Sequence, residues 1–230
     1  MVVTLVAAQP RIVGVTVGDW FKYGDITFSW SSNDPNATIP YGFEELSETE
    51  WMKMTVTDVS GTNITFQIIF HFKNGTEKTY DNIVDIDTGE GNVTMWAISA
   101  NLNANDTIYS SFGYSTMKIN ETIVRTYPDG VRDTNHLNNT AERSGAEFYE
   151  HLSMNNYWDR SCGIIVEMSQ EQTSQIEGYT TIWSLLIRIT ESNFWVVPEF
   201  PTWTSILLLV IVLTVTIVIS KRRPLKTPIR

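Results

Sequence analysis

The sequence predicts a mainly β fold: an antiparallel meander curled into a half-barrel or barrel-like sheet, with one or two short helices and one C-terminal transmembrane helix. Three observations lead to this prediction. Segments that alternate apolar and polar residues, as half-buried strands do, outnumber plausible helices. Many of these segments are joined by short glycine-containing stretches that are typical of hairpin turns. A long uncharged apolar run lies near the C-terminus.

The first eight residues are interpreted as the remnant of a signal peptide. Val6-Ala7-Ala8 resembles a small-x-small cleavage site, and the residues before it form a fragment of the apolar core that a secretory signal needs. An ordinary first strand is the alternative. Residues 9–194 are predicted to form one β-rich extracellular domain, which its core must stabilise because the single Cys162 excludes an intramolecular disulfide.

The clearest strand pattern lies in the segment TNITFQIIFHF. Its apolar residues share one face of a strand: Ile64, Phe66, Ile68, Phe70 and Phe72. The flanking turn signals, SGT and NGT, predict three-residue loops and a meander over 51–59, 63–73 and 77–87. The expected pairs are Val56 with Phe66, Met54 with Ile68 and Met52 with Phe70 on one side, and Val84 with Phe66 and Ile86 with Ile64 on the other.

Further hairpins are expected downstream, with turns at Gly113, at residues 128–130 and at Gly163. Helix is sparse. The best candidate is FEELSETEW, residues 43–51, whose crowded glutamates are interpreted as a solvated helix face. A second short helix is expected around Ala141 to Leu152.

The apolar run predicts a membrane-spanning helix over residues 202–220. It contains no charged residue, and about 19 residues of helix cover roughly 29 Å, close to the thickness of a bilayer core. Residues 195–201 form the predicted juxtamembrane linker, and 221–230 a basic cytoplasmic tail. The basic cluster that sets this topology contains Lys221, Arg222, Arg223 and Lys226. We therefore expect a single-pass protein of the cell membrane, with its N-terminal domain outside.

The charge of the predicted extracellular domain excludes one class of partner. Five of the 16 basic residues lie in the tail, which leaves 11 against 26 acidic residues. An acidic domain is repelled by the phosphates of nucleic acid, so nucleic-acid binding is not expected. The expected partners are membrane lipid, through the spanning helix, and other copies or other surface proteins.

Seven Asn-x-Ser/Thr sequons occur before the apolar run, and we expect some of them to be N-glycosylated. They begin at Asn36, Asn63, Asn74, Asn92, Asn105, Asn120 and Asn138.

Two resemblances add to this interpretation. The order Pro198-Glu199-Phe200, apolar span and basic cluster resembles the archaeal PEF-CTERM sorting signal. That family implies an archaeosortase partner that removes the span, whereas a retained anchor with a stiff proline linker is the alternative. The stretches VGVTVGDWFKYG, SGTNIT, NGTE and ISANLNANDTIY, together with YWDRSCGIIVEM, resemble uncharacterised archaeal surface proteins. The last is similar to the Trp-x-Asp-x-x-Thr-Gly hairpin of lipoprotein-carrier-like half-barrels, with Ser161-Cys162 in place of the usual polar-Thr pair.

The residues suggest no catalytic, cofactor or metal site. The three histidines lack metalloprotease spacing, no nucleophile elbow is present, and DIDTGEGN departs from a calcium loop and is interpreted as a strand-to-turn corner. The first functional hypothesis is a non-catalytic surface protein acting in adhesion, assembly or shielding. The alternative is a carrier or sensor of an apolar ligand or lipid. The side chains that motivate this alternative are Met52, Met54, Phe66, Phe70 and Phe72.

Overall fold

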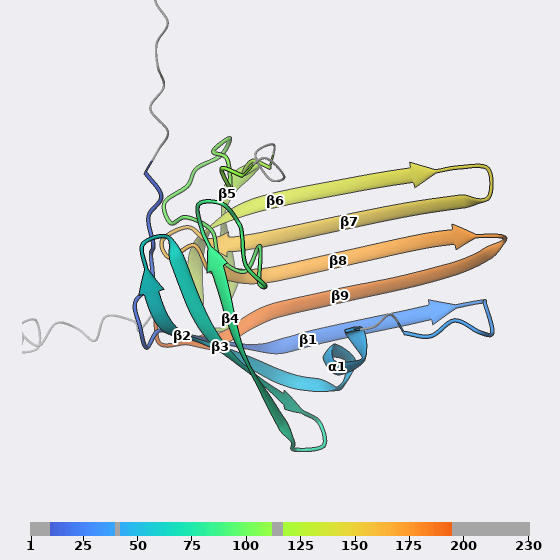
Figure 1. Ribbon diagram of the computed structural model, residues 1–230, viewed down its shortest axis with the longest axis horizontal. Helices are drawn as coiled ribbons and strands as arrows, with labels where there is room; N and C mark the ends of the chain where they lie inside the picture. Colours follow the sequence, from blue (N-terminus) through green and yellow to red (C-terminus); the bar gives the residue numbers. More distant parts are fainter. Residues whose placement is uncertain (1–9, 40–41, 112–116, 195–230) are drawn as a thin grey trace, which may run out of the picture. The chain divides into compact units, whose positions relative to one another are not determined.

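The computed structural model describes residues 10–39, 42–111 and 117–194. The chain divides into two units between Phe194 and Trp195, and the fold belongs to the first. Its described residues form one helix, α1 (Phe43–Glu48), and nine strands (Figure 1). The strands are β1 (Trp20–Ser32), β2 (Thr49–Ser60), β3 (Asn63–Phe72), β4 (Glu77–Asp85), β5 (Glu121–Tyr127), β6 (Gly130–Ser144), β7 (Phe148–Asp159), β8 (Ile165–Ile176) and β9 (Tyr179–Ser192).

All nine strands belong to one antiparallel sheet with the order β4-β3-β2-β1-β9-β8-β7-β6-β5. Two meanders, β1–β4 and β5–β9, join where β1 pairs with β9. The prediction of a mainly β, antiparallel fold is thus confirmed. The sheet does not close, because β4 and β5 remain at its two edges. Edge strand β4 is solvated along most of its length and carries Glu77, Lys78 and Asp81, charges that disfavour further strand pairing.

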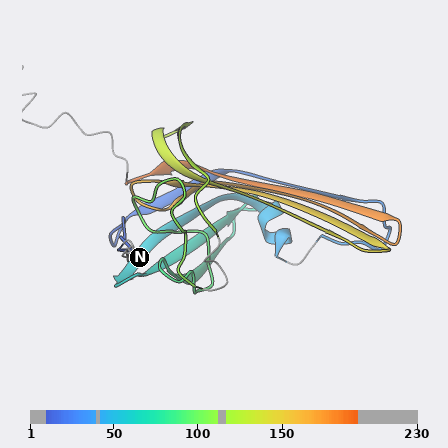
Figure 2. The same ribbon diagram turned by 90° about the horizontal axis from the view of Figure 1, so that it is seen from above.

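The sheet is bent, so that its two faces have different surroundings. Strands β1 and β6–β9 run together as long ribbons, while β2–β4 turn away from them (Figure 1). Seen from above, α1 and β2–β4 lie on the same side of the long strands (Figure 2). We call the face on this side the inner face and its opposite the outer face.

The predicted pairing of β2 with β3 is confirmed at all three positions, including Val56 with Phe66. The loop is shorter than expected, since Ser60 pairs with Asn63, and a register shift between Val56 and Asp58 compensates for the missing residue. The prediction for β3 and β4 is wrong by two residues. Phe66 pairs with Asn82 and Ile64 with Val84. The turn is centred earlier because the Asn74 side chain accepts a 2.9 Å hydrogen bond from Thr76 N.

The second predicted helix is wrong. Ala141 pairs with Leu152 in the hairpin of β6 and β7, so the backbone there forms a sheet ladder. Its Ala, Glu and Arg residues favour helix locally, but pairing of β7 with β8 fixes this segment as strand. The turns at 128–130 and near Gly163 are confirmed. Of the hairpin predicted around Gly113, the described part shows one bridge, Thr107 with Lys118, and residues 112–116 lie outside the described ranges.

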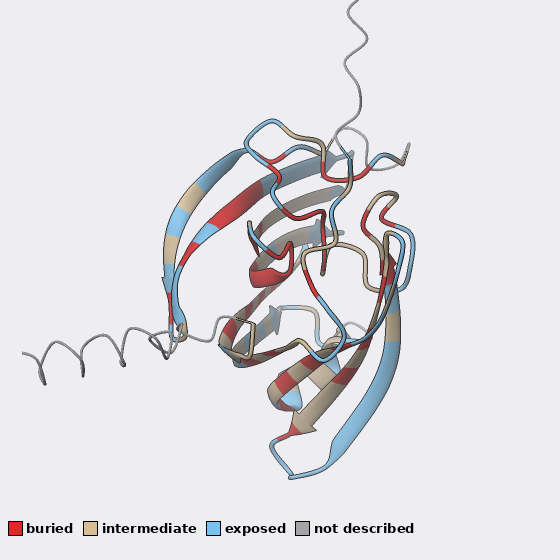
Figure 3. Ribbon diagram, turned by 90° about the vertical axis from the view of Figure 1, so that its left-hand side faces the viewer, coloured by how far each residue is buried: buried red, intermediate tan, exposed pale blue. Residues whose placement is uncertain are grey.

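One end of the inner face is covered by irregular chain. Residues 86–111 and 117–120 connect β4 to β5, and residues 10–19 pack against them. Ala100 N donates a 2.8 Å hydrogen bond to Ile12 O, and Ala97 forms an isolated bridge with Ile164. Figure 3 shows buried residues on both the strands and the covering chain at this end. The fully buried side chains here include Phe21, Tyr23, Ile86, Ile98, Ile108 and Trp158.

The predicted span 202–220 and its flanks lie outside the described residues, as does the predicted signal remnant 1–8. Within the described ranges, no helix has the length and apolar character needed to cross a bilayer.

Candidate functional site

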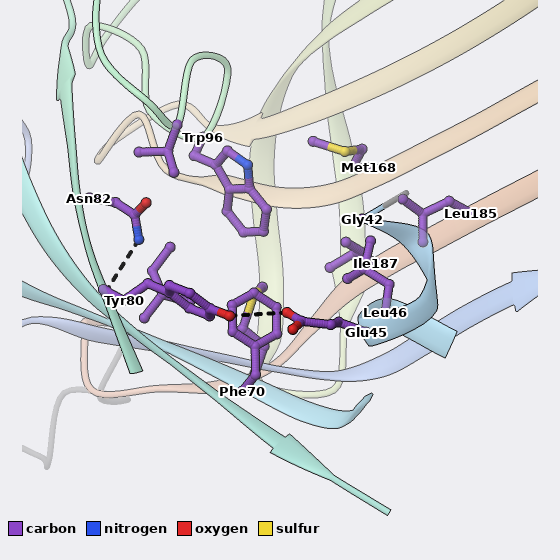
Figure 4. Close-up of a pocket in the computed structure, with 13 residues that line it drawn as sticks. Gly42, Glu45, Leu46, Phe70, Tyr80, Asn82, Trp96, Met168, Leu185 and Ile187 are labelled. Atoms are coloured by element: carbon purple, nitrogen blue, oxygen red, sulfur yellow. Dashed lines mark hydrogen bonds between the residues drawn. The ribbon is translucent and has the colours of Figure 1, made fainter. Parts of the chain in front are cut away.

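The main cavity lies on the inner face, between the sheet, helix α1 and the covering chain (Figure 4). Its volume is about 390 Å³. Strands β2 and β3 contribute Met52, Ile68 and Phe70, and β8 and β9 contribute Met168, Leu185 and Ile187. The remaining lining residues are Gly42, Glu45, Leu46, Tyr80, Asn82, Val93 and Trp96. The walls therefore come from segments far apart in the sequence, and most are apolar.

Helix α1 is fastened to the edge strand β4 across this cavity. Glu45 forms an ion pair with Lys78 and accepts a 3.1 Å hydrogen bond from the Tyr80 hydroxyl. The hydrogen bond from Lys78 is the largest cause that lowers the pKa of the Glu45 carboxyl. Burial opposes it, and the weaker effects of the Tyr80 hydrogen bond and the Lys78 charge add to the lowering. These three side chains form the latch between α1 and β4. The latch is polar and partly exposed, so water can compete for it.

On its sheet-facing side, α1 is anchored by aromatic rings. Phe43 stacks on Phe28 of β1 with ring centroids 5.3 Å apart, and its ring lies 4.7 Å from that of Trp183 in β9. One side of α1 is thus held by aromatic packing and the other by the polar latch. Because α1 has only six residues, these tertiary contacts, and not its intrinsic propensity, must keep it helical.

The covering chain is fixed by the turn between β7 and β8. Trp158 Nε1 donates a 2.7 Å hydrogen bond to Met95 O, Ile165 N donates to Trp96 O at 3.0 Å, and Ile98 N donates to Gly163 O at 2.9 Å. Inside the turn, Asp159 Oδ1 accepts hydrogen bonds from Ser161 N and Cys162 N. The turn therefore holds Trp96 where it lines the cavity. This turn lies within the segment YWDRSCGIIVEM, which forms the hairpin of β7 and β8.

Beyond α1, the inner face remains richer in large apolar side chains than the outer face. One cross-strand row on the inner face contains Ala141, Leu152, Gln172, Trp183 and Trp30. The neighbouring row on the outer face contains Thr140, Ser153, Glu171, Ser184 and Ser29. At the tips of the long hairpins, Phe148, Ile176 and Tyr179 stay exposed. This asymmetry is typical of an antiparallel sheet with one face against apolar groups and the other face in water.

The outer face carries a charged cluster instead. Glu167 is buried, with two 2.8–2.9 Å contacts to Arg125 and a 3.2 Å contact to Arg188. Arg188 also pairs with Asp25 at 3.0 Å. The two guanidinium groups compensate the buried carboxylate, and Arg125 ties β5 to β8. These side chains form the Glu167 ion-pair network, which links β1, β5, β8 and β9 on the outer face of the bent sheet.

The five side chains predicted for an apolar ligand site divide into two groups. Met52 and Phe70 line the cavity, whereas Met54, Phe66 and Phe72 lie in the buried core outside its lining. The contributions of α1, β8 and β9 to the cavity were not predicted from the sequence; they include Glu45, Met168 and Leu185. The alternation in YTTIWSLLIRIT marks one face of β9, but no local pattern shows that this face meets α1 and β3.

The structure describes all seven sequons and leaves their use as a prediction. Six of the asparagines are exposed, and Asn63 is half-buried at the start of β3. Asn138 Nδ2 donates a hydrogen bond to Asn155 Oδ1, which a glycan on Asn138 would compete with. Pro198, Glu199 and Phe200 and the basic cluster at 221–226 lie outside the described residues.

The described residues contain no group of three or more His, Cys, Asp or Glu side chains placed to hold a metal ion. The corner at 85–89 is the predicted turn, in which Asp85 Oδ1 accepts hydrogen bonds from Asp87 N and Thr88 N. Burial raises the pKa of the Cys162 thiol, with Asp159 adding to the effect, so this thiol is a poor nucleophile in the folded protein. No protein-family model matches the sequence, and comparison with curated proteins finds no significant match.

Proposed function

We propose that this domain binds an apolar ligand, such as a lipid chain, in the inner-face cavity of a half-barrel. The observation that carries the proposal is the cavity itself, a partly open pocket of about 390 Å³ that is lined mostly by apolar side chains from separate parts of the chain. Pockets for small ligands have volumes of roughly 300–1,000 Å³ and are mostly apolar with a few polar groups. The chain therefore acts as a carrier or sensor.

The composition of the walls supports a flexible, chain-like ligand. Met52 and Met168 lie on the walls contributed by β2 and β8, and thioether side chains adapt to irregular apolar shapes. Phe70 and Trp96 supply broad flat surfaces for methylene groups. Among the described residues of the lining, the only charged side chain is that of Glu45, which is already neutralised by Lys78. Such a site discriminates against ligands that are charged along their whole length.

We place this domain outside a cell membrane, on a helix formed by residues 202–220, with the basic tail in the cytoplasm. The support is the uncharged apolar run followed by Lys221, Arg222 and Arg223. A membrane anchor keeps a lipid carrier beside its source of ligand. If an archaeosortase processes the tail, Glu199→Ala should block the change in mass that processing causes. A retained anchor predicts the same mass for both proteins.

A surface role in adhesion, assembly or shielding, without catalytic activity, is the second candidate. Six exposed sequon asparagines favour it, because glycans on them would coat the domain. It needs no ligand in the cavity. The two candidate functions therefore differ in whether an apolar ligand stays bound to the protein when it is extracted from its membrane.

Native mass spectrometry of the full-length protein, extracted in detergent from its own membrane, separates them. The carrier predicts a bound apolar molecule in defined stoichiometry. Val93→Trp inserts a large ring from the covering chain into the cavity, and we expect it to abolish this adduct. The matched control is Val124→Trp on β5, where the native side chain is 68% exposed. An empty wild-type protein, or an adduct that survives Val93→Trp, contradicts the carrier.

A further inference from the structure

The inner face contains a buried amide that has no partner among the described residues. Asn156 of β7 is 0% exposed, and neither its Nδ2 nor its Oδ1 makes a hydrogen bond within the described ranges. Leaving buried polar atoms unpaired is costly, and native proteins rarely do so without a reason. The amide can donate and accept at the same time.

Asn156 is the immediate neighbour of the cavity wall. It pairs directly with Met168 of β8, which lines the cavity, so the two side chains share the inner face. Opposed side chains in an antiparallel pair have Cβ atoms about 4.5–5.5 Å apart, a distance that one end group of a ligand spans. Figure 4 shows the flexible Met168 side chain on the wall beside Trp96. Met168 therefore lies next to the amide on the cavity wall, and its thioether side chain can adapt its shape.

The carboxylate and amide side chains in the described lining of the cavity are already engaged. Glu45 binds Lys78 and Tyr80, and Asn82 Nδ2 donates a 3.3 Å hydrogen bond to Tyr80 O. They lie on α1 and β4, whereas Asn156 lies on β7 at the opposite part of the inner face. Asn156 is therefore the side chain best placed to give the cavity a second, polar recognition point inside the domain.

We propose that Asn156 hydrogen-bonds a hydroxyl or carbonyl group of the ligand, which makes the ligand an amphiphile and not a plain hydrocarbon. This inference rests on the proposed function, because it concerns the same cavity. The chemical class is an uncharged lipid alcohol or ester, such as a long-chain alcohol or the glycerol end of a lipid. Its apolar chain occupies the space between Met52, Phe70 and Leu185, and its oxygen displaces Met168 to reach the amide.

The test uses full-length protein in detergent micelles with two probes, dodecanol and dodecane, each competing against the fluorescent apolar reporter 1-aminoanthracene. The measured quantity is the ratio of the two competition constants. Asn156→Leu keeps the side-chain size and removes the amide, and we expect it to lower the preference for the alcohol about tenfold. The control is Asn139→Leu, an exposed inner-face position on β6 that pairs with Met154 and leaves the sequon at Asn138 intact.

Thermal denaturation of the ligand-free variants provides the second measurement. If the amide has no partner in the free protein, Asn156→Leu keeps or raises the unfolding midpoint, because an unsatisfied polar group is removed. A lower midpoint shows that the amide has a structural partner and overturns the inference. An unchanged alcohol preference overturns it as well. If neither probe displaces the reporter from the wild type, the carrier function itself fails, which is a distinguishable result.

Discussion

Replacing Gly163 by alanine should loosen the covering chain from the sheet. Gly163 has φ +77°, and an added Cβ would lie 2.1 Å from Ile98 O, a backbone atom that cannot move aside cheaply. The left-handed conformation costs a residue with a Cβ about 1–2 kcal/mol. Displacing the adjacent backbone weakens the hydrogen bond from Ile98 N to Gly163 O, worth about 0.5–1.5 kcal/mol. We expect a total cost of about 1.5–3.5 kcal/mol.

A matched substitution separates the two causes. Gly178 in the β8–β9 turn has φ +85° but no atom within 4 Å of an added Cβ, so Gly178→Ala should cost only the conformational part. Chemical denaturation of both variants, followed by circular dichroism, gives the two free energies of unfolding. Equal losses in Gly163→Ala and Gly178→Ala would refute the packing of residues 96–98 against the turn. The position of Trp96 on the cavity wall would then lose its support.

Three further predictions concern the charged and buried groups. Glu167→Gln should lower the free energy of unfolding by about 2–3 kcal/mol, because two partly buried guanidinium groups lose their carboxylate partner. The control Glu191→Gln removes an exposed ion pair and should cost under about 1 kcal/mol. Urea denaturation measures both, and equal costs contradict a stabilising role of the Glu167 ion-pair network. The latch stabilises α1 fully at pH values above the ordinary carboxyl pKa, and this contribution is lost as the pH falls through the lowered pKa of Glu45. Acid should therefore speed ligand release from the wild type but not from Glu45→Gln. Release rates measured by stopped flow that depend on pH in the same way in both proteins argue against the latch. Cys162 should resist a thiol reagent until the protein unfolds, and rapid labelling of the folded protein contradicts its burial.

The local strand pattern predicts pairing well where both neighbours alternate. The β2–β3 register follows from matching apolar faces and a turn, and a shift by one residue would have moved Met54 and Phe66 to the wrong face. A shift by two keeps every side chain on its face. Pattern alone therefore cannot exclude it, and the β3–β4 register depends on the turn at Asn74.

Long-range convergence is what the sequence does not reveal. The cavity forms because β1 pairs with β9, which brings Leu185 and Ile187 to the same inner face as Met52. These residues are separated by more than a hundred positions, and no local period encodes their meeting. Helix propensity in residues 141–152 was likewise a poor guide, because pairing on both sides of β7 outweighs it.

Photo-crosslinking shows whether a ligand binds in the inner-face cavity. Full-length protein in its own membrane is exposed to a long-chain alcohol carrying a diazirine in mid-chain, irradiated, and mapped by peptide mass spectrometry. If a ligand binds there, we expect labels on Met52, Phe70, Trp96 or Met168, and their loss in Val93→Trp but not in Val124→Trp. Labels confined to residues 202–220, with none on the cavity walls in the wild type, would contradict it.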